Sequence, residues 1–496
     1  MARPIPFVLA GVVLATHLAF TAPQSGTASP TAYAADLAAR RDRIMASLDA
    51  DTALILWSAP PRVYSTDTNY EYRQESNLLY LSGIDQQDTA MILVPGATGP
   101  KAFLFVRAAN PVRELWEGHT LTPDEVSARS GVARVFAQET TEAFDAFVER
   151  LLSTTPGAEA AFGAFSAAIT QGRARLAILA PLDGRVAADD EPHLAWAKAM
   201  AQRHPGVSLF SAARLLDRQR QIKTPYEQEI LRRSVEISAE AHIEGMRATR
   251  PGRWEYEVEA AIEYWFHRNG ALSPGYPSIV GSGPNATTLH YEASTRRMNS
   301  GDLLLVDAAG NYQGLTGDIT RTYPVSGRFT ADQRRLYELV LRAQEAGIAA
   351  ARPGADVAAI TRAVRAALGT GLLQLGLVSD PGAGSGESAQ ISLWFPHGPT
   401  HGIGMDVHEP LGVLEPGSAF VIEPGLYIRE DTLDRLAADP AQADVARRLA
   451  PAVARFRNMG VRIEDSFLMT ATGPEMLSRK APRTVRDIER IVGTAR

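Results

Sequence analysis

Apolar residues recur in two different patterns along the chain. In the first part, short apolar runs bounded by turn-forming residues lie at 54–57, 90–94 and 102–106, which predicts strands. Helical spacing appears at Leu37, Ile44 and Leu48 and again over 142–152. Strands that alternate with helices predict an α/β domain over residues 35–215.

The second part, residues 216–496, begins with a long helix. Thr224 is a suitable N-cap and Pro225 fits a first turn, so we expect a helix over 225–246 and another over 254–268. Further helices are expected at 331–351 and 356–368, and strands at 303–308, 318–325, 402–408, 418–428 and 461–470. Helices grouped around antiparallel strands predict an α+β domain. Residues 429–458 form a charged, alanine-rich insert that we expect to be helical and mostly exposed.

The composition limits the chemistry that the chain can perform. Its 496 residues suggest two or three domains, and a formal charge of −6 argues against a nucleic-acid partner. There is no cysteine, so disulfides, thiolate zinc sites and cysteine nucleophiles are excluded. Any metal must therefore be held by histidine, aspartate and glutamate, which suit harder divalent ions.

The N-terminus has the features of a secretory signal peptide, predicted over residues 1–34. Arg3 supplies a positive charge, an apolar run covers residues 5–20, and Ala32-Tyr33-Ala34 is a small-residue cleavage motif. We expect an exported protein, periplasmic or secreted, without stable membrane association after cleavage. An uncleaved membrane anchor is the alternative. No later segment reaches the roughly 18 unbroken apolar residues of a membrane span.

Four acidic residues stand beside apolar runs in the second part. Asp307, Glu423 and Glu464 each follow such a run, and Asp318 starts a predicted strand after a glycine-containing turn. If the strands at 303–308 and 318–325 form a hairpin, Asp307 and Asp318 come close together. Taken singly, each acid is more easily explained as a surface residue, and Asp318 has Arg321 nearby as an ion-pair partner.

Three of the ten histidines, His397, His401 and His408, fall within twelve positions of a glycine-rich segment. A neutral imidazole can bind a metal, and the other histidines could donate hydrogen bonds to a substrate. Structural roles in a loop are the alternative. Four carboxylates gathered in one domain would repel one another, and two divalent cations would offset that repulsion and lower the pKa of a shared water.

Residues 225–470 resemble the pita-bread metallopeptidases, which include Xaa-Pro aminopeptidase, prolidase and methionine aminopeptidase. The similarity is carried by NATTLHY (285–291), DAAGNYQGLTGDITRT (307–322), HGPTHGIGMDVH (397–408), EPGLY (423–427) and GVRIED (460–465). YRQESNLLYLSG (72–83) and RELWEG (113–118) resemble the N-terminal domain of Xaa-Pro aminopeptidase. Methionine aminopeptidases generally lack such a domain, so the resemblance favours the other two families.

The resemblance implies a centre of two divalent metal ions, with Mn²⁺ expected first and Co²⁺, Zn²⁺ or Fe²⁺ also compatible with the ligands. Asp307 would bind one ion, and His401 and Glu423 would bind the other. Asp318 and Glu464 would bridge both ions. Glu423 would also take a proton from the attacking water.

The same resemblance gives roles to residues around the metals. His290 would contact the scissile peptide and its leaving nitrogen, and His397 would face the substrate carbonyl. His408 would stabilise charge on the tetrahedral intermediate, and Arg462 would orient the neighbouring acids. Trp116 would help line the pocket of a neighbouring subunit, which implies a homo-oligomer; a partly exposed core aromatic is the alternative.

The predicted activity is the release of the N-terminal residue from peptides with proline at the second position. Gly402 replaces a larger residue common in the family, and the connection from His408 to Leu414 is short, which we interpret as an open pocket rim. The insert at 429–458 resembles that of prolidase, so a dipeptidase that cuts Xaa-Pro is the alternative. An inactive binding module and creatinase-like hydrolysis are disfavoured, because all five metal-ligand positions are occupied by suitable residues.

Overall fold

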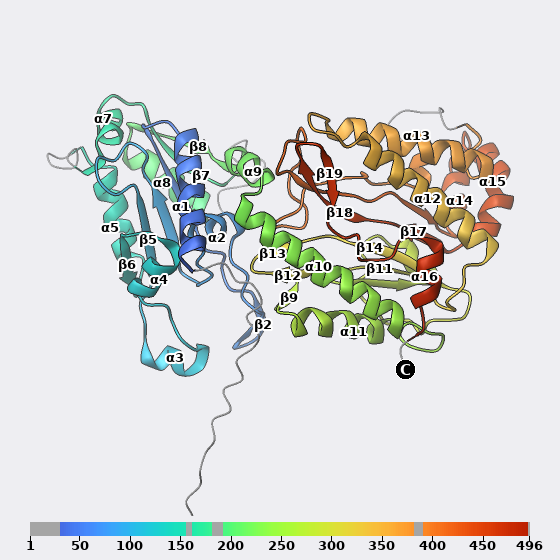
Figure 1. Ribbon diagram of the computed structural model, residues 1–496. Coiled ribbons are helices and arrows are strands. Elements are labelled where there is room, and N and C mark those ends of the chain that lie inside the picture. The colour runs from blue at the N-terminus through green and yellow to red at the C-terminus, as the bar shows by residue number, and fades with distance from the viewer. Residues whose placement is uncertain (1–29, 155–160, 181–191, 381–389, 495–496) are drawn as a thin grey trace, which may run out of the picture.

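The computed structural model describes residues 30–154, 161–180, 192–380 and 390–494, which fold into two lobes (Figure 1). The first lobe ends with α9 (Ala213–Gln221), and the second begins with α10 (Pro225–Ala248). The side chain of Thr224 accepts a hydrogen bond from the Glu227 N–H and Pro225 occupies the first turn, so the predicted start of α10 is confirmed. Among the described residues, no helix is both long and apolar enough to cross a membrane.

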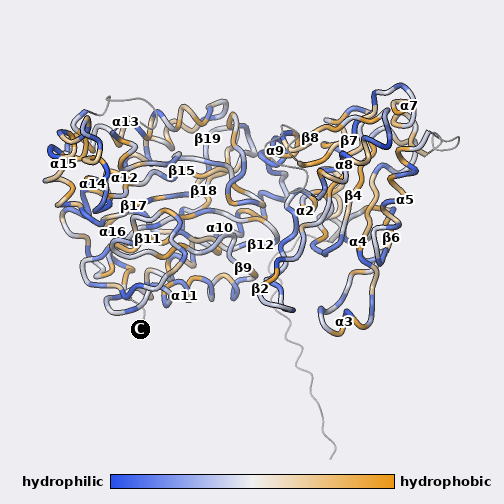
Figure 2. The backbone as a smooth tube through the Cα atoms, turned by 180° about the vertical axis from the view of Figure 1, so that it is seen from behind, coloured by the Kyte–Doolittle hydropathy of each residue, from blue (hydrophilic) through white to orange (hydrophobic). Residues whose placement is uncertain are grey.

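A six-stranded mixed sheet forms the centre of the first lobe. In spatial order its strands are β6 (Val135–Gln138), β5 (Ala102–Arg107), β4 (Ala90–Leu93), β1 (Thr52–Trp57), β7 (Ala174–Ile178) and β8 (Val207–Ser211). Strand β1 pairs antiparallel with β4 and parallel with β7. Figure 2 shows that the hydrophobic segments of β4 and β7 lie within the lobe, as the apolar runs in the sequence predict.

Alternate residues of β1 face two separate layers of helices. Leu54 and Leu56 share a core with α1 (Pro30–Ser47), α2 (Ser76–Ser82) and α4 (Pro123–Ser130). Ala53 and Ile55 share the other core with α5 (Glu142–Leu151), α7 (Ala164–Thr170) and α8 (Pro192–Arg203). The predicted α/β class of this lobe is confirmed.

The first described helix bears on the predicted signal peptide. Residues 1–29 lie outside the described residues, and α1 begins at Pro30. The predicted cleavage site after Ala34 therefore falls within α1. In that helix Tyr33 stacks on Tyr226 of α10 with ring centroids 5.3 Å apart. Cleavage and export stay predictions.

The second lobe holds several small antiparallel sheets. They are β10 (Ile279–Ser282), β11 (Leu303–Asp307) and β14 (Thr320–Pro324); β13 (Leu315–Thr316), β12 (Gly310–Tyr312) and β9 (Ser273–Pro274); β15 (Ala419–Ile422), β18 (Asp465–Thr470) and β19 (Gly473–Met476); and β16 (Gly425–Ile428) with β17 (Met459–Arg462). Figure 1 shows α10 and α11 (Glu255–Arg268) on one side of these strands and α12 (Ala331–Ala350) and α13 (Val357–Leu375) on the other. The predicted α+β class is confirmed.

The insert at residues 429–458 forms two helices, α14 (Thr432–Ala437) and α15 (Ala443–Phe456), as predicted. Leu449, Val453 and Phe456 of α15 are buried in the main core of the lobe, so the insert also packs against the domain. The last described helix, α16 (Val485–Ile491), packs against the same core.

Two predicted strands are interrupted at acidic residues. The stretch 418–428 is divided into β15 and β16 by Glu423-Pro424, and the stretch 461–470 is divided by Ile463-Glu464. Proline has no N–H to give to a ladder, and the strands on each side pair with different partners, β15 with β18 and β16 with β17. Both acids therefore lie where a strand pair ends.

The prediction of a strand at residues 402–408 is wrong. This segment is a loop that turns back on itself, so that the Gly402 N–H donates to the Glu409 carbonyl. The Glu409 side chain lies inside the loop, where it accepts from the Met405 N–H and pairs with Arg220 and Lys223. Hydrogen bonds within the loop therefore satisfy N–H groups that a strand would donate to a neighbouring strand.

Candidate metal centre

The hairpin predicted from the spacing of Asp307 and Asp318 is present. Strand β11 ends at Asp307 and pairs antiparallel with β14, with Asp307 opposite Thr320. The Tyr276 hydroxyl lies 2.7 Å from Asp307 Oδ1 and 2.6 Å from Asp318 Oδ1, so it joins the two carboxylates. Both carboxylates are buried, at 7% and 4% exposure.

A line of polar residues on α10 supports this hairpin from behind. Ser234, Ser238 and His242 are spaced by four residues and lie on one face of the helix. The Ser234 hydroxyl donates to the Gly310 carbonyl at 2.9 Å, and the Gly310 N–H donates to Ser238 Oγ at 3.0 Å. His242 Nε2 lies 3.0 Å from the Ala308 carbonyl oxygen. The connection between Asp307 and Asp318 is thus held by a rigid helix.

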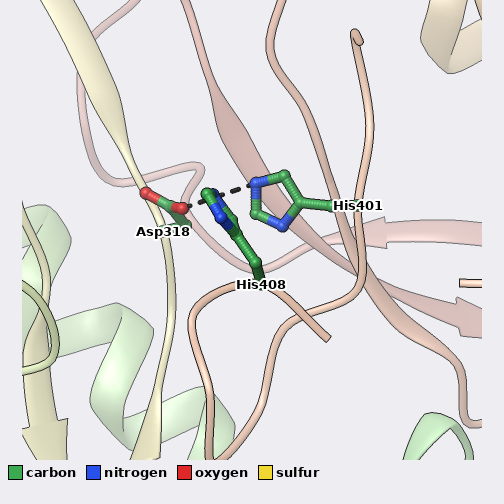
Figure 3. Close-up of side chains that lie close together, drawn as sticks. All are labelled: Asp318, His401 and His408. Atoms are coloured by element: carbon green, nitrogen blue, oxygen red, sulfur yellow. Dashed lines mark ion pairs between the residues drawn. The ribbon is translucent and has the colours of Figure 1, made fainter. Parts of the chain in front are cut away.

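The remaining predicted ligands lie beside the sheet that contains β15 and β18. Glu423 directly follows β15, and Glu464 directly precedes β18. His401 Nε2 lies 3.6 Å from Asp318 Oδ2, 3.6 Å from Glu423 Oε1 and 3.8 Å from Glu464 Oε1. Figure 3 shows His401 and His408 directed towards Asp318, and the two imidazole rings are 4.3 Å apart. Ligand atoms of Asp307, Asp318 and Glu464 lie within 4.8 Å of one another, and so do those of His401, Glu423 and Glu464.

Arg462 connects the carboxylates with the surrounding side chains. Its Nη2 donates to Asp307 Oδ2 at 2.5 Å, and its Nε donates to Thr320 Oγ1 at 3.0 Å. The Thr320 hydroxyl in turn donates to Glu464 Oε2 at 2.7 Å. Arg462 therefore orients two of the acids, one directly and one through Thr320.

The other predicted site histidines border the same group. The ring of His290 lies 6.4 Å from that of His408. His397 Nδ1 donates to the Gly398 carbonyl at 2.8 Å, which leaves Nε2 to accept from the Tyr427 hydroxyl at 2.8 Å. Both nitrogens of His397 are therefore engaged within the protein.

Burial and mutual repulsion dominate the electrostatics of the metal-free site. Burial, Asp307 and other acids raise the pKa of Glu464 to about 8, and burial with neighbouring carboxylates raises the pKa values of Asp318 and Glu423 well above their usual range. Burial acts on Asp307 in the same direction, but Arg462 and Tyr276 outweigh it and lower its pKa. Burial lowers the pKa of His401 to about 4, so the imidazole is neutral at neutral pH.

The donor set fits divalent cations. Glu464 Oε1 is buried and has no hydrogen-bond partner among the described residues, an arrangement that is costly unless a cation or a water satisfies the oxygen. Three buried carboxylates with raised pKa values and a neutral imidazole are the groups that a hard or borderline divalent ion would ligate. A cation would also remove the repulsion that raises the pKa values.

Gly402 does not have the role that we expected. A Cβ at this position would lie 2.9 Å from the Glu409 carbonyl oxygen and 3.1 Å from that of Pro410, both main-chain atoms. The interpretation that Gly402 opens the pocket rim is therefore wrong. The missing side chain instead lets the short connection after His408 fold back on the loop.

Trp116 lies apart from the other predicted site residues. It belongs to α3 (Pro111–Glu117), which projects from the first lobe (Figure 1), and it is 83% exposed. The alternative of a partly exposed core aromatic is wrong for this chain, because most of the side chain is exposed. Val112 and Leu115 on the same short helix are also exposed, at 71% and 80%.

Tyr276 and Tyr427 belong to the centre but were missed in the sequence. Tyr276 stands in the segment 273–278, which contains no acidic residue and no histidine, and its contact with both aspartates depends on the strand arrangement. Tyr427 lies in the quoted EPGLY segment, yet its hydroxyl contacts to Arg462 and His397 depend on the pairing of β16 with β17.

Comparison with known proteins agrees with this geometry. Residues 229–471 match the model of metallopeptidase family M24, and residues 37–157 match that of the aminopeptidase P N-terminal domain. The Xaa-Pro aminopeptidase of Escherichia coli is 32% identical over 470 residues, which cover 92% of this chain and 97% of that protein. The human Xaa-Pro dipeptidase is 36% identical over 296 residues, which cover 54% of this chain and 59% of that protein.

A solved structure of zinc-substituted E. coli aminopeptidase P in complex with product has a TM-score of 0.74 and 29% identity. The match covers 95% of this chain and 100% of that structure, so both lobes are shared. The dipeptidase match covers about half of this chain, whereas the aminopeptidase matches cover nearly all of it. The chain belongs to the Xaa-Pro aminopeptidases of metallopeptidase family M24 and is a metal-dependent peptidase.

Proposed function

We propose that this chain is a two-metal enzyme that releases the N-terminal residue from peptides with proline at the second position. The observation that carries the proposal is the position of Glu464, whose carboxylate lies close to the ligand atoms of Asp307 and Asp318 in one group and to those of His401 and Glu423 in another. A carboxylate shared in this way suits a bridge between two cations. In this assignment Asp318 would be the second bridge, Asp307 would hold one ion, and His401 and Glu423 would hold the other.

Two bound ions would supply Lewis acidity and lower the pKa of a water between them. Glu423 is the residue that we assign to receive the proton of that water, because its buried carboxylate lies within the ligand group, with Oε1 3.6 Å from His401 Nε2. Arg462 and Tyr276 hold Asp307 in place, and Thr320 holds Glu464. The acids therefore need little reorganisation during the reaction.

The histidines have separate roles in the proposal. Burial lowers the pKa values of both His397 and His408, so neutral rings face the substrate. His408 and His290 are assigned to donate hydrogen bonds to substrate oxygens or the leaving nitrogen. His397 was expected to face the substrate carbonyl, but both its nitrogens are engaged within the protein, so we assign it a contact with the proline ring instead.

The metal assignment is tested by metal content. We propose Mn²⁺ as the native ion, since four carboxylates and one imidazole form a mostly oxygen donor set. Asp318→Asn should lower both the number of bound ions and the rate. Asp444→Asn, an exposed acid on α15, is the matched control and should change neither. A metal-free preparation with full activity would overturn the mechanism.

Peptide length separates the two candidate activities. A dipeptidase must recognise the carboxylate of proline, whereas an aminopeptidase leaves that end open. The match to the aminopeptidase P N-terminal domain favours the second activity. We expect a higher kcat/KM for Xaa-Pro-Xaa than for Xaa-Pro with the same metal, and turnover of the dipeptide alone would move the assignment to prolidase.

Assembly and export are further parts of the proposal. The exposed apolar side chains Val112, Leu115 and Trp116 of α3 suit a contact in which Trp116 of one copy approaches the pocket of another copy. Trp116→Ala should weaken substrate affinity without changing metal content, and a fully active monomer would remove the idea. Mass spectrometry of the native protein should give a mature chain beginning near Ala35; a chain that starts at Met1 would refute export by this signal.

A further inference from the structure

A cavity of about 540 Å³ lies next to the metal centre, between residues 287–289, residues 392–396 and the start of the insert. Its lining reaches the active site at three points. Leu289 directly precedes His290, Pro396 directly precedes His397, and the hydroxyl of Tyr427 lies 2.8 Å from His397 Nε2. The cavity is therefore separated from His397 by Tyr427, and its wall contains the residues that precede His290 and His397, which we place on the leaving-group side of the scissile bond.

The charged side chains of this cavity are incompletely balanced. Arg429 Nε lies 3.0 Å from Asp431 Oδ1, and Arg435 Nε lies 3.5 Å from Asp431 Oδ2. Two guanidinium groups thus share one carboxylate, which leaves one net positive charge at neutral pH. All three side chains are between 42% and 64% exposed, so these ion pairs are weak and can be exchanged for contacts with a ligand.

A second observation at the same place also points to a ligand. Thr432 lines the cavity and is only 5% exposed, yet its Oγ1 has no hydrogen-bond partner among the described residues. A buried hydroxyl is normally satisfied by protein or water. The remaining lining is largely apolar and includes Leu289 and Pro396, so the cavity combines an apolar wall with a positively charged rim and a free hydroxyl.

We propose that this cavity binds the part of the peptide that follows proline and recognises its C-terminal carboxylate. Arg429 and Arg435 would donate to the carboxylate, Thr432 would supply a further hydrogen bond, and the apolar wall would contact the preceding side chain. The proposal rests on the proposed aminopeptidase activity and names its preferred substrates, which are short peptides with a free C-terminus. It also gives the insert at 429–458 a role in an enzyme that acts on chains longer than a dipeptide.

The test compares two peptides that differ only in terminal charge. The rate constant kcat/KM is measured with Mn²⁺ for Xaa-Pro-Leu as the free acid and as the C-terminal amide. Charge-assisted hydrogen bonds predict about a tenfold preference of the natural enzyme for the acid. Arg429→Gln combined with Arg435→Gln should bring the ratio of acid to amide close to one, mainly by raising KM for the acid.

The control is Arg447→Gln, because Arg447 belongs to the same insert but is 75% exposed and pairs with Asp444. This variant should keep the natural preference. Equal rates for the acid and the amide in the natural enzyme would overturn the inference, and so would a preference for the acid that survives in the double variant. In either case, cleavage of the peptides would still support the proposed aminopeptidase activity. Failure to cleave either peptide with metal present would overturn both.

Discussion

Replacing Arg321 should destabilise the second lobe more than any surface change of charge. Arg321 and Asp465 are both completely buried, and Arg321 Nη2 donates to Asp465 Oδ1 at 2.6 Å. Arg321 also donates to the Glu464 carbonyl at 2.5 Å, next to the proposed bridging ligand. The Ser478 hydroxyl and Gln344 Nε2 donate to the same carboxylate of Asp465.

The size of the stability loss follows from the charge that the substitution leaves unpaired. Arg321→Met leaves a buried carboxylate without its cation, and breaking a buried ion pair from one side costs about 3–5 kcal/mol. Replacing both partners, as in Arg321→Met with Asp465→Leu, leaves no unpaired charge and should recover part of that loss. The double variant should therefore be more stable than the Arg321→Met single variant.

The assay is urea unfolding of the metal-free protein, with the free energy taken from the transition that unfolds the second lobe. Arg335→Met is the control, since Arg335 is 54% exposed and its pair with Asp332 should contribute less than about 1 kcal/mol. A loss below about 1 kcal/mol in Arg321→Met would contradict the buried-pair argument. The argument would also be contradicted if the double variant lost as much stability as the Arg321→Met and Asp465→Leu single variants together.

Three further changes test the support around the metals. Ser238→Ala removes the hydrogen-bond acceptor of the Gly310 N–H, so it should lower the free energy of unfolding by about 1–3 kcal/mol and weaken Mn²⁺ binding. Calorimetry measures the Mn²⁺ affinity, and an unchanged value would exclude a positioning role for Ser238. Gly402→Ala places a methyl group against main chain and should reduce the expressed, folded fraction; normal yield and activity would refute the close packing. The pKa of Glu464 rises on folding from 4.5 to about 8, so the metal-free protein should lose stability as pH rises from about 6.5 to 8, above the range in which the lowered pKa values of His397 and His401 oppose this trend. Urea unfolding at several pH values measures the change, and a flat profile over that range would contradict the assigned pKa.

Local pattern was sufficient for the parts of the fold that depend on neighbouring residues. The N-cap of α10, the hairpin that joins Asp307 to Asp318, and the helical insert follow from turn chemistry and periodicity. The acids at 423 and 464 were recognisable because each follows an apolar run that places it at the end of a strand.

Long-range contacts were not predictable from the same patterns. Arg321 was considered a surface partner of Asp318, but it is buried and pairs with Asp465, which lies 144 residues away in the chain. The loop at 402–408 has the apolar alternation of a strand, yet the interior position of Glu409 folds it back. In both cases a buried charge determines the local structure, and its partner lies on another element.

The most direct test of the two-metal account is a titration of the metal-free protein with Mn²⁺. Bound metal per chain and the release of the N-terminal residue from Xaa-Pro-Xaa are measured on the same samples. The account predicts negligible activity without metal and full activity only as two ions bind per chain, with Asp318→Asn failing to reach either endpoint. Full activity without metal, or an Asp318→Asn variant that binds two ions and turns over at the natural rate, would contradict it.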